Sequence, residues 1–119
     1  KISSEDLALC VDTLVAGQNA TLTVSHGTPQ ETVAIMWSTS LGSTTANSGT
    51  WCVDFGIVFP PANPYSQLVS FGNCNVNGDY QVTRPVPASA AGITLYLQAA
   101  EENTCPDTRM SNIVTRVVL

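Results

Sequence analysis

The chain has 119 residues, a length typical of one domain, and its formal net charge is −5. Only Lys1, Arg84, Arg109 and Arg116 are basic, so no basic patch for nucleic acid or for an anionic membrane surface can form. No apolar run reaches the roughly 18 residues of a membrane-spanning helix, so we expect no membrane insertion.

The cysteines are scattered along the chain, at Cys10, Cys52, Cys74 and Cys105, with no C-x-x-C pair. Zinc sites and thioredoxin-like sites use closely spaced cysteines, so neither is expected. An even number of distant cysteines in a β-rich chain indicates two disulfides and an oxidising compartment. A surface rich in Thr, Ser and Asn, with few charges, is also typical of extracellular β-proteins.

Period-two alternation of apolar and polar residues recurs along the chain, separated by turn residues, and indicates β-strands. In the strand expected at Thr32–Thr39 both faces are apolar, which places it centrally in a sheet. The Gly/Ser/Thr/Asn-rich stretch Ser40–Thr50 is expected to be a loop, and Asn77-Gly78 a tight turn. Pro85 is expected to mark either an edge strand or the end of a strand. The expected strands are Leu7–Val11, Ala20–Ser25, Thr32–Thr39, Trp51–Phe59, Gln67–Phe71, Asp79–Val86, Ile93–Ala100 and Ser111–Leu119.

Seven to eight short strands at regular spacing predict an all-β Greek-key β-sandwich forming a single domain over residues 1–119. In that topology the loops that carry Cys74 and Cys105 share one end of the sandwich, and Cys10 and Cys52 lie near the other. The pairs Cys10–Cys52 and Cys74–Cys105 are therefore favoured. Four cysteines allow three connectivities, and the choice among them stays open.

A series of short motifs, in a fixed order, covers most of the chain. They are Leu14–Val24, Pro29, Gly42-Ser43, Cys52, Asn77-Gly78, Val86-Pro87, Gly92–Ala99, Cys105 and Ser111–Val114. In this order they resemble an immunoglobulin-like module of secreted bacterial surface proteins. The resemblance implies an immunoglobulin-like sandwich, secretion and a role in surface or extracellular assemblies. It supplies no catalytic residues; Gln30, Cys10 and Cys74 depart from its pattern.

Candidate residues for chemistry are few. His26 is the only histidine and lies in an expected turn, without a nucleophile motif, so we predict no enzyme activity and no cofactor. Glu101, Glu102 and Asp107 share an expected loop, and Asp79 is expected at the same end. Their spacing matches no calcium loop, so no metal site is predicted.

Two aromatic residues are candidates for stacking against a sugar: Trp51, after the expected flexible loop, and Tyr96, on the expected outward face of its strand. Trp37 is instead expected in the core. The sequon Asn19-Ala20-Thr21 makes Asn19 a candidate for glycosylation. A carbohydrate-binding or adhesive module of a larger secreted protein is the alternative function that these residues suggest.

The two ends of the chain suggest how the domain would work. Residues 1–9 could extend beyond the domain as a strand, and the chain stops at Leu119 within an apolar strand. One interpretation is a module excerpted from a longer secreted protein. The other is a self-associating subunit of a surface assembly or filament, held by strand pairing between neighbours. We expect a non-catalytic structural protein at the cell surface or outside the cell.

Overall fold

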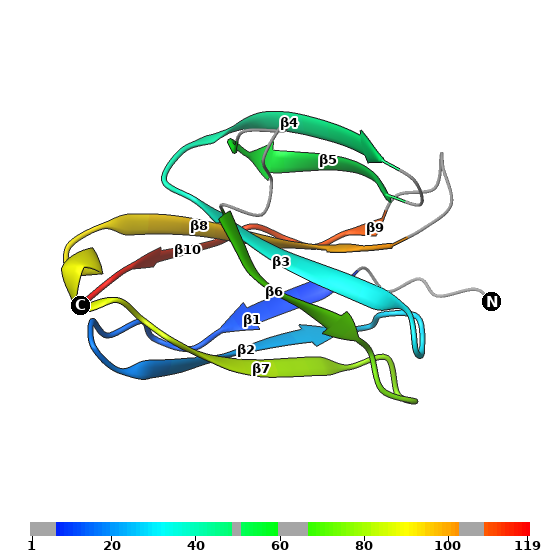
Figure 1. Ribbon diagram of the computed structural model, residues 1–119, viewed down its shortest axis with the longest axis horizontal. Helices are drawn as coiled ribbons and strands as arrows, with labels where there is room; N and C mark the ends of the chain where they lie inside the picture. The colour runs from blue at the N-terminus through cyan, green and yellow to red at the C-terminus, as the bar shows by residue number, and fades with distance from the viewer. Residues whose placement is uncertain (1–6, 49–50, 60–66, 103–108) are drawn as a thin grey trace.

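The computed structural model describes residues 7–48, 51–59, 67–102 and 109–119, with the backbone alone at 46–48 and 51–53 (Figure 1). The described residues form an all-β, sandwich-like structure of antiparallel strands. The strands are β1 (Ala8–Val11), β2 (Asn19–Ser25), β3 (Thr32–Ser38), β4 (Leu41–Ser48), β5 (Trp51–Ile57), β6 (Leu68–Asn73), β7 (Tyr80–Pro85), β8 (Thr94–Glu101), β9 (Arg109–Met110) and β10 (Val114–Val117). A short 3-10 helix, η2 (Ala88–Ala90), follows β7.

The first sheet has the strand order β1-β2-β7 and forms the lower layer in Figure 1. Strand β2 alternates as its sequence predicts, with Ala20, Leu22 and Val24 buried and the residues between them half-buried. Because β2 is central, β7 lies at an edge of this sheet, and Pro85 is its last residue. Both positions that the sequence allowed for Pro85 are therefore observed.

The second sheet has the order β10-β8-β3-β6, and the two-residue strand β9 also pairs with β8. Strand β3 lies between β8 and β6, so its predicted central position is confirmed. Its two apolar faces have separate partners: Val33 and Ile35 face the first sheet, whereas Met36 belongs to a second apolar cluster.

The main core fills the space between the two sheets. Trp37 packs against this core and stays partly exposed. Leu7 and Leu9 are each 2% exposed, so this part of the N-terminal segment belongs to the core of its own domain. The remainder of the predicted N-terminal extension, residues 1–6, lies outside the described residues. The buried residues of the main core are Leu7, Leu9, Val11, Leu14, Ala20, Leu22, Val24, Val33, Ile35, Cys74, Val86, Leu97, Ala99, Val114 and Val118.

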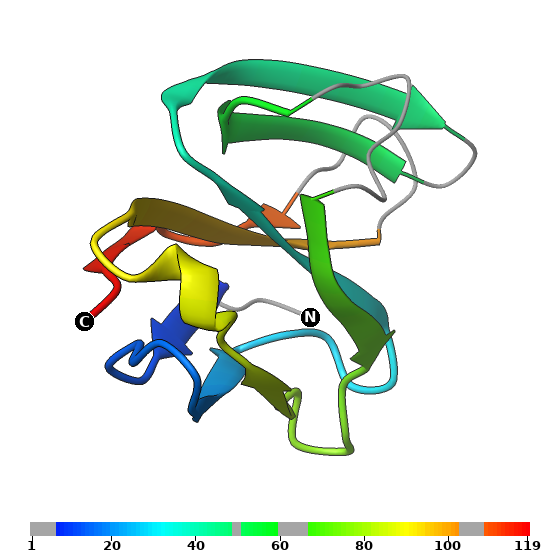
Figure 2. The same cartoon turned by 60° about the vertical axis from the view of Figure 1, so that its left-hand side comes forward.

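Strands β4 and β5 form an antiparallel hairpin that lies over the outer face of the second sheet as a further layer (Figures 1 and 2). The loop predicted at Ser40–Thr50 is therefore wrong, because residues 41–48 form a strand. The physical reason is tertiary: the buried Thr44 hydroxyl donates to the Ile57 carbonyl and accepts from the Phe59 N–H. A composition with weak strand propensity thus forms a strand where specific partners exist.

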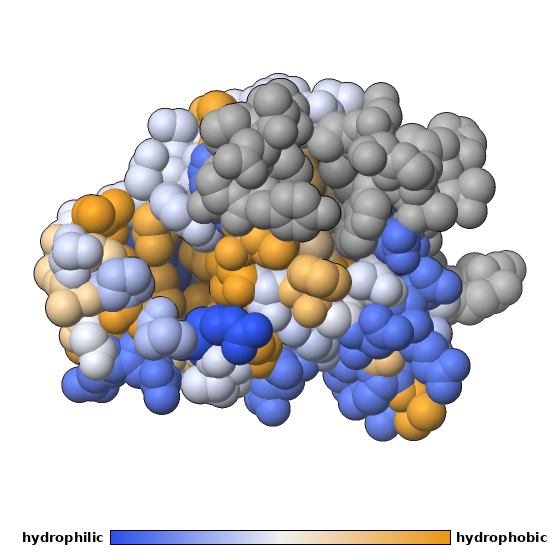
Figure 3. All heavy atoms as spheres, in the orientation of Figure 1, coloured by the Kyte–Doolittle hydropathy of each residue, from blue (hydrophilic) through white to orange (hydrophobic). Residues whose placement is uncertain are grey.

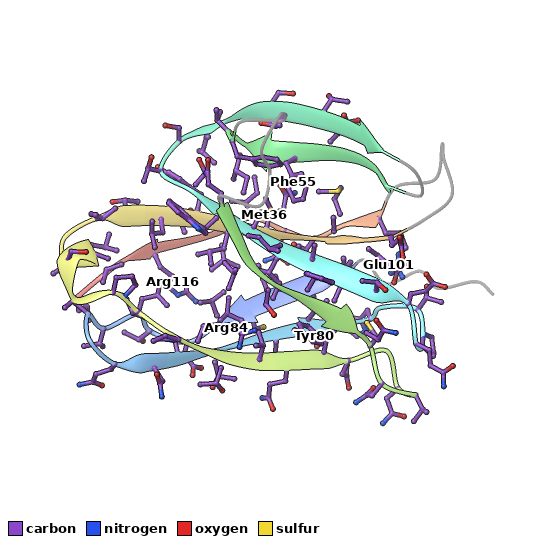
Figure 4. The ribbon with its side chains drawn as sticks, in the orientation of Figure 1. Met36, Phe55, Tyr80, Arg84, Glu101 and Arg116 are labelled. Carbon is purple, nitrogen blue, oxygen red and sulfur yellow. The ribbon has the colours of Figure 1, made fainter. Side chains whose placement is uncertain are left out.

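The hairpin covers a second apolar cluster built from Met36, Phe55, Ile57, Phe59 and Ala100. Figure 4 shows Met36 and Phe55 between the hairpin and β3. This cover also explains why the polar residue Gln98 of β8 is only 6% exposed.

Candidate functional site: strand edges and seams

The outer edge of β1 is closed by one side chain from the segment between β9 and β10. The Leu9 N–H donates to Asn112 Oδ1 at 2.9 Å, and Asn112 Nδ2 donates to the Leu9 carbonyl at 3.2 Å. The Asn112 amide therefore bonds β1 as a neighbouring strand would, with one donor and one acceptor. A second chain cannot pair with Leu9 while these bonds are present.

Arg116 adds a further bond at the place where β1 of the first sheet meets the second sheet. Such a meeting of an edge of one sheet with the other sheet is called a seam below. From β10 of the second sheet, its Nη2 donates to the Val11 carbonyl of β1 at 2.8 Å. Its Nη1 donates to the carbonyl of the preceding residue, Thr115, at 3.0 Å. The guanidinium thus bridges the sheets and satisfies a carbonyl of its own strand.

Arg84 makes an equivalent arrangement at the opposite seam, between β7 and β6 (Figure 4). Its Nη1 donates to the Thr83 carbonyl at 3.1 Å, and its Nη2 donates to Ser70 Oγ at 3.0 Å. Ser70 Oγ lies 2.7 Å from the Tyr80 hydroxyl, which extends the bridge. The Tyr80 ring packs against Gly72, where a Cβ would lie 2.5 Å from the ring. The close approach requires glycine there.

The surface around this seam is mixed in character. Figure 3 shows apolar residues in the middle of this face, below the hairpin layer, and hydrophilic residues along much of the lower edge. Val82 of β7 and Val69 of β6 are partly buried and pack against the core. The polar bridge of Arg84 therefore spans a seam whose interior is apolar.

The hairpin has a different kind of edge. Among the described strands, β4 pairs only with β5, and it is the outermost of them in both ribbon views (Figures 1 and 2). Its sequence, Leu-Gly-Ser-Thr-Thr-Ala-Asn-Ser, contains no charge and no proline. Charged residues and prolines are the usual devices that discourage strand addition, so the sequence of β4 leaves its edge compatible with a partner strand.

The opposite edge of the hairpin is fastened to the second sheet. The Gly56 N–H of β5 donates to Gln98 Oε1 at 2.8 Å, and Gln98 Nε2 donates to the Ser111 carbonyl at 2.9 Å. A Cβ at Gly56 would lie 2.7 Å from Ile113 Cδ1, so the hairpin packs closely there. The hairpin therefore has two different edges. The β5 edge lies toward the second sheet, and the β4 edge lies on the side away from it.

The cysteines differ from the prediction. Cys10 and Cys74 are free thiols in the structure, so neither Cys10–Cys52 nor Cys74–Cys105 is formed. Cys10 is exposed on β1, and Cys74 is buried. Cys105 and the Cys52 side chain lie outside the described residues. Burial raises the pKa of the Cys74 thiol above its ordinary value, and the nearby Glu101 carboxylate raises it further.

Glu101 is the last residue of β8. The prediction that placed it in a solvated loop is wrong. Its side chain is fully buried; Oε1 accepts from the Thr28 N–H at 2.5 Å, and Oε2 accepts from Thr28 Oγ1 at 3.0 Å. Arg109 Nη1 lies 3.4 Å from Oε1, and Nη2 donates to the His26 carbonyl at 2.8 Å. These bonds hold the turn between β2 and β3 against β8.

The remaining predicted site residues are dispersed. His26 is exposed in its turn, as predicted, with a positive φ of 64°. Asn19, the candidate for glycosylation, is exposed at the start of β2. Tyr96 is half-buried against the second cluster, whereas the Trp51 side chain and Asp107 lie outside the described residues. Within the described ranges, no three His, Cys, Asp or Glu residues are grouped as metal ligands.

The chain matches no family model, and comparisons with curated proteins and with solved structures give no significant match. In the part that the structure describes, no helix has the length and hydropathy to cross a membrane.

Proposed function

We propose that this chain is a non-catalytic structural module of an extracellular or surface assembly, joined to its neighbours by pairing between strand edges. The observation that carries the proposal is the contrast between edges. The seam at β1 is bonded by Asn112 and Arg116, the seam at β7 by Arg84, and β4 offers an uncharged outer edge. Backbone groups at such an edge are recognised by an extended strand.

The proposed module is immunoglobulin-like. The orders β1-β2-β7 and β10-β8-β3-β6 support this, because they correspond to strands A-B-E and G-F-C with one further strand beside C. On this correspondence, the β4–β5 hairpin is an insertion between C and its neighbour. An insertion on a rigid sandwich is a usual position for a recognition element.

Secretion is supported by composition. Charged residues make up 11% of the chain, and there is a single lysine. A surface covered mainly by hydroxyl and amide groups suits a protein that works outside the cell in contact with other chains.

Negative-stain electron microscopy of the protein as secreted tests the proposal. The expected result is ordered assemblies whose spacing relates to the longest dimension of the domain, 41 Å. Isolated particles at every concentration, with no partner chain attached, would overturn it.

A further inference from the structure

The turn between β6 and β7 lies beside the turn between β2 and β3 at one end of the sandwich (Figure 1). A backbone bond joins the two turns, from the Gly27 N–H to the Gly78 carbonyl at 2.9 Å. Gly78 has a positive φ of 82°, and a Cβ at this position would overlap the Gly27 carbonyl oxygen. Both the backbone conformation and the contact between the turns therefore require glycine at position 78.

This glycine follows an exposed asparagine, Asn77, and the two form the only Asn-Gly pair in the sequence. An asparagine side chain loses its amide without an enzyme when the next backbone nitrogen attacks it. Glycine permits the attack best, because it has no Cβ beside that nitrogen. Asn75 of the same turn precedes Val76, whose β-branched side chain crowds its own backbone nitrogen. The chemistry of this turn therefore selects Asn77.

Asn75 holds the turn closed. The Gly78 N–H donates to the Asn75 carbonyl at 3.0 Å. Asn75 Oδ1 accepts from the Asn77 N–H at 2.9 Å and from the Asp79 N–H at 3.0 Å. Attack requires the Gly78 nitrogen to lose its proton and to turn the face of its peptide toward Asn77 Cγ, which these bonds oppose. The reaction therefore proceeds from the opened turn, and its rate follows the fraction of time that the turn is open.

We propose that Asn77 is a site of spontaneous deamidation and that Asn75 sets its rate. The Gly78 nitrogen gives its proton to a water-derived base and forms a bond to Asn77 Cγ. The Cγ–Nδ2 bond breaks, and the amide nitrogen takes up a proton and leaves as ammonia. Water then opens the resulting succinimide ring. Opening at Cγ gives aspartate, whereas opening at the backbone carbonyl carbon gives isoaspartate, in which the chain runs through the former side chain.

Isoaspartate would loosen this end of the sandwich. It adds one carbon to the backbone before Gly78, which is buried and bonded to Gly27. The added length displaces the Gly78 carbonyl from the Gly27 N–H. Both products also add a negative charge two residues from Asp79. This modification is independent of the proposed function, because it concerns only the lifetime of the contact between the two turns.

Peptide mapping by mass spectrometry tests the site. The full chain is incubated at slightly alkaline pH, and fragmentation distinguishes aspartate from isoaspartate at position 77. Wild type in urea gives the rate of the fully opened turn. Asn75→Ala removes the side-chain acceptor, and Asn75→Asp is its matched control, since a carboxylate oxygen still accepts from both N–H groups.

We expect native wild type to react at least about tenfold more slowly than the unfolded chain. Native Asn75→Ala should react about tenfold faster than native wild type, because two hydrogen bonds of the turn are lost, and Asn75→Asp should stay close to wild type. Equal rates for native wild type and native Asn75→Ala would overturn the role of Asn75. No product at position 77 in either native protein, while the unfolded chain reacts, would overturn the site.

Hydrogen exchange provides a second, independent readout. If Asn75→Ala fails to fold, wild type alone decides: the ratio of its native to its unfolded deamidation rate should match the open fraction reported by exchange of the Gly78 N–H. A mismatch would overturn the control by turn opening. Exchange of the Gly27 N–H should be faster in the isolated isoaspartate form than in Asn77→Asp, which has the new charge but not the longer backbone. Equal exchange in these two proteins would overturn the loosening of the turns.

Discussion

Asn112 completes the edge of β1 by bonding both backbone groups of Leu9, a residue 103 positions earlier in the chain. The two bonds join the start of the first sheet to the end of the second. They also occupy the groups that a donated strand would need. A short polar side chain thus both fastens the seam and protects the edge.

Replacing Asn112 by alanine should lower the free energy of unfolding by about 1–3 kcal/mol, because both Leu9 groups lose their partner in a partly buried setting. Urea unfolding followed by circular dichroism measures the change. As a control, Gln81→Ala, on an exposed position of β7, should change stability by less than about 0.5 kcal/mol. Equal small effects would mean that water replaces the Asn112 amide without loss.

Arg84 and Arg116 share no bonding partner and lie at opposite seams, so their contributions should add. We expect Arg84→Lys and Arg116→Lys each to lose about 1 kcal/mol, because lysine cannot reach two acceptors with a planar fork. The double variant should lose the sum, within about 0.5 kcal/mol. Thermal unfolding of the four proteins checks this, and strong non-additivity would show that the seams are coupled.

Much of the sandwich could be predicted from the sequence, because strands such as β2 and β8 carry clear alternation between turn signals. The predicted central place of β3 also followed from two apolar faces. The hairpin strand β4 could not be predicted, since Thr44 is held by partners at Ile57 and Phe59 that local composition does not reveal.

The contacts that join the two sheets at the seams could not be predicted from the sequence either. The two bonds between Asn112 and Leu9 depend on the register between strands far apart in the chain. The buried state of Glu101 likewise depends on Thr28 and Arg109 meeting at one end of the sandwich. Gly72 can be read from the sequence, but the reason that this position needs a glycine, its contact with the Tyr80 ring, appears only in three dimensions.

Glu101→Gln should destabilise the domain by about 2–4 kcal/mol, because the buried carboxylate accepts from Thr28 and faces Arg109. The amide keeps the shape but removes the charge that matches the guanidinium. Chemical denaturation gives the value, and Glu31→Gln, the same change at a half-buried position of the neighbouring turn, is the matched control. A loss no larger than that of the control would refute the role given to the carboxylate.

Gly72→Ala should destabilise by about 1–3 kcal/mol, because its Cβ would overlap the Tyr80 ring and force a shift of β6 or β7. In a Tyr80→Ala background the ring is absent, so the same substitution should cost much less. Tyr80→Phe keeps the ring and should give no such relief. A thermodynamic cycle over these variants measures the coupling, and a cost unchanged by Tyr80→Ala would place the strain elsewhere.

The Cys74 thiol should make the domain sensitive to alkaline pH when the protein is kept reduced. Its folded-state pKa is raised above the ordinary 9.0 by burial first and then by the Glu101 and Asp79 carboxylates. The stability linked to the protonated thiol is therefore complete below pH 9.0 and is lost as the pH rises through the higher folded-state pKa. Unfolding free energies measured from neutral to alkaline pH should fall less steeply for Cys74→Ala than for wild type. The exposed Cys10→Ala should retain the wild-type slope, and identical slopes for all three proteins would exclude Cys74 as the source.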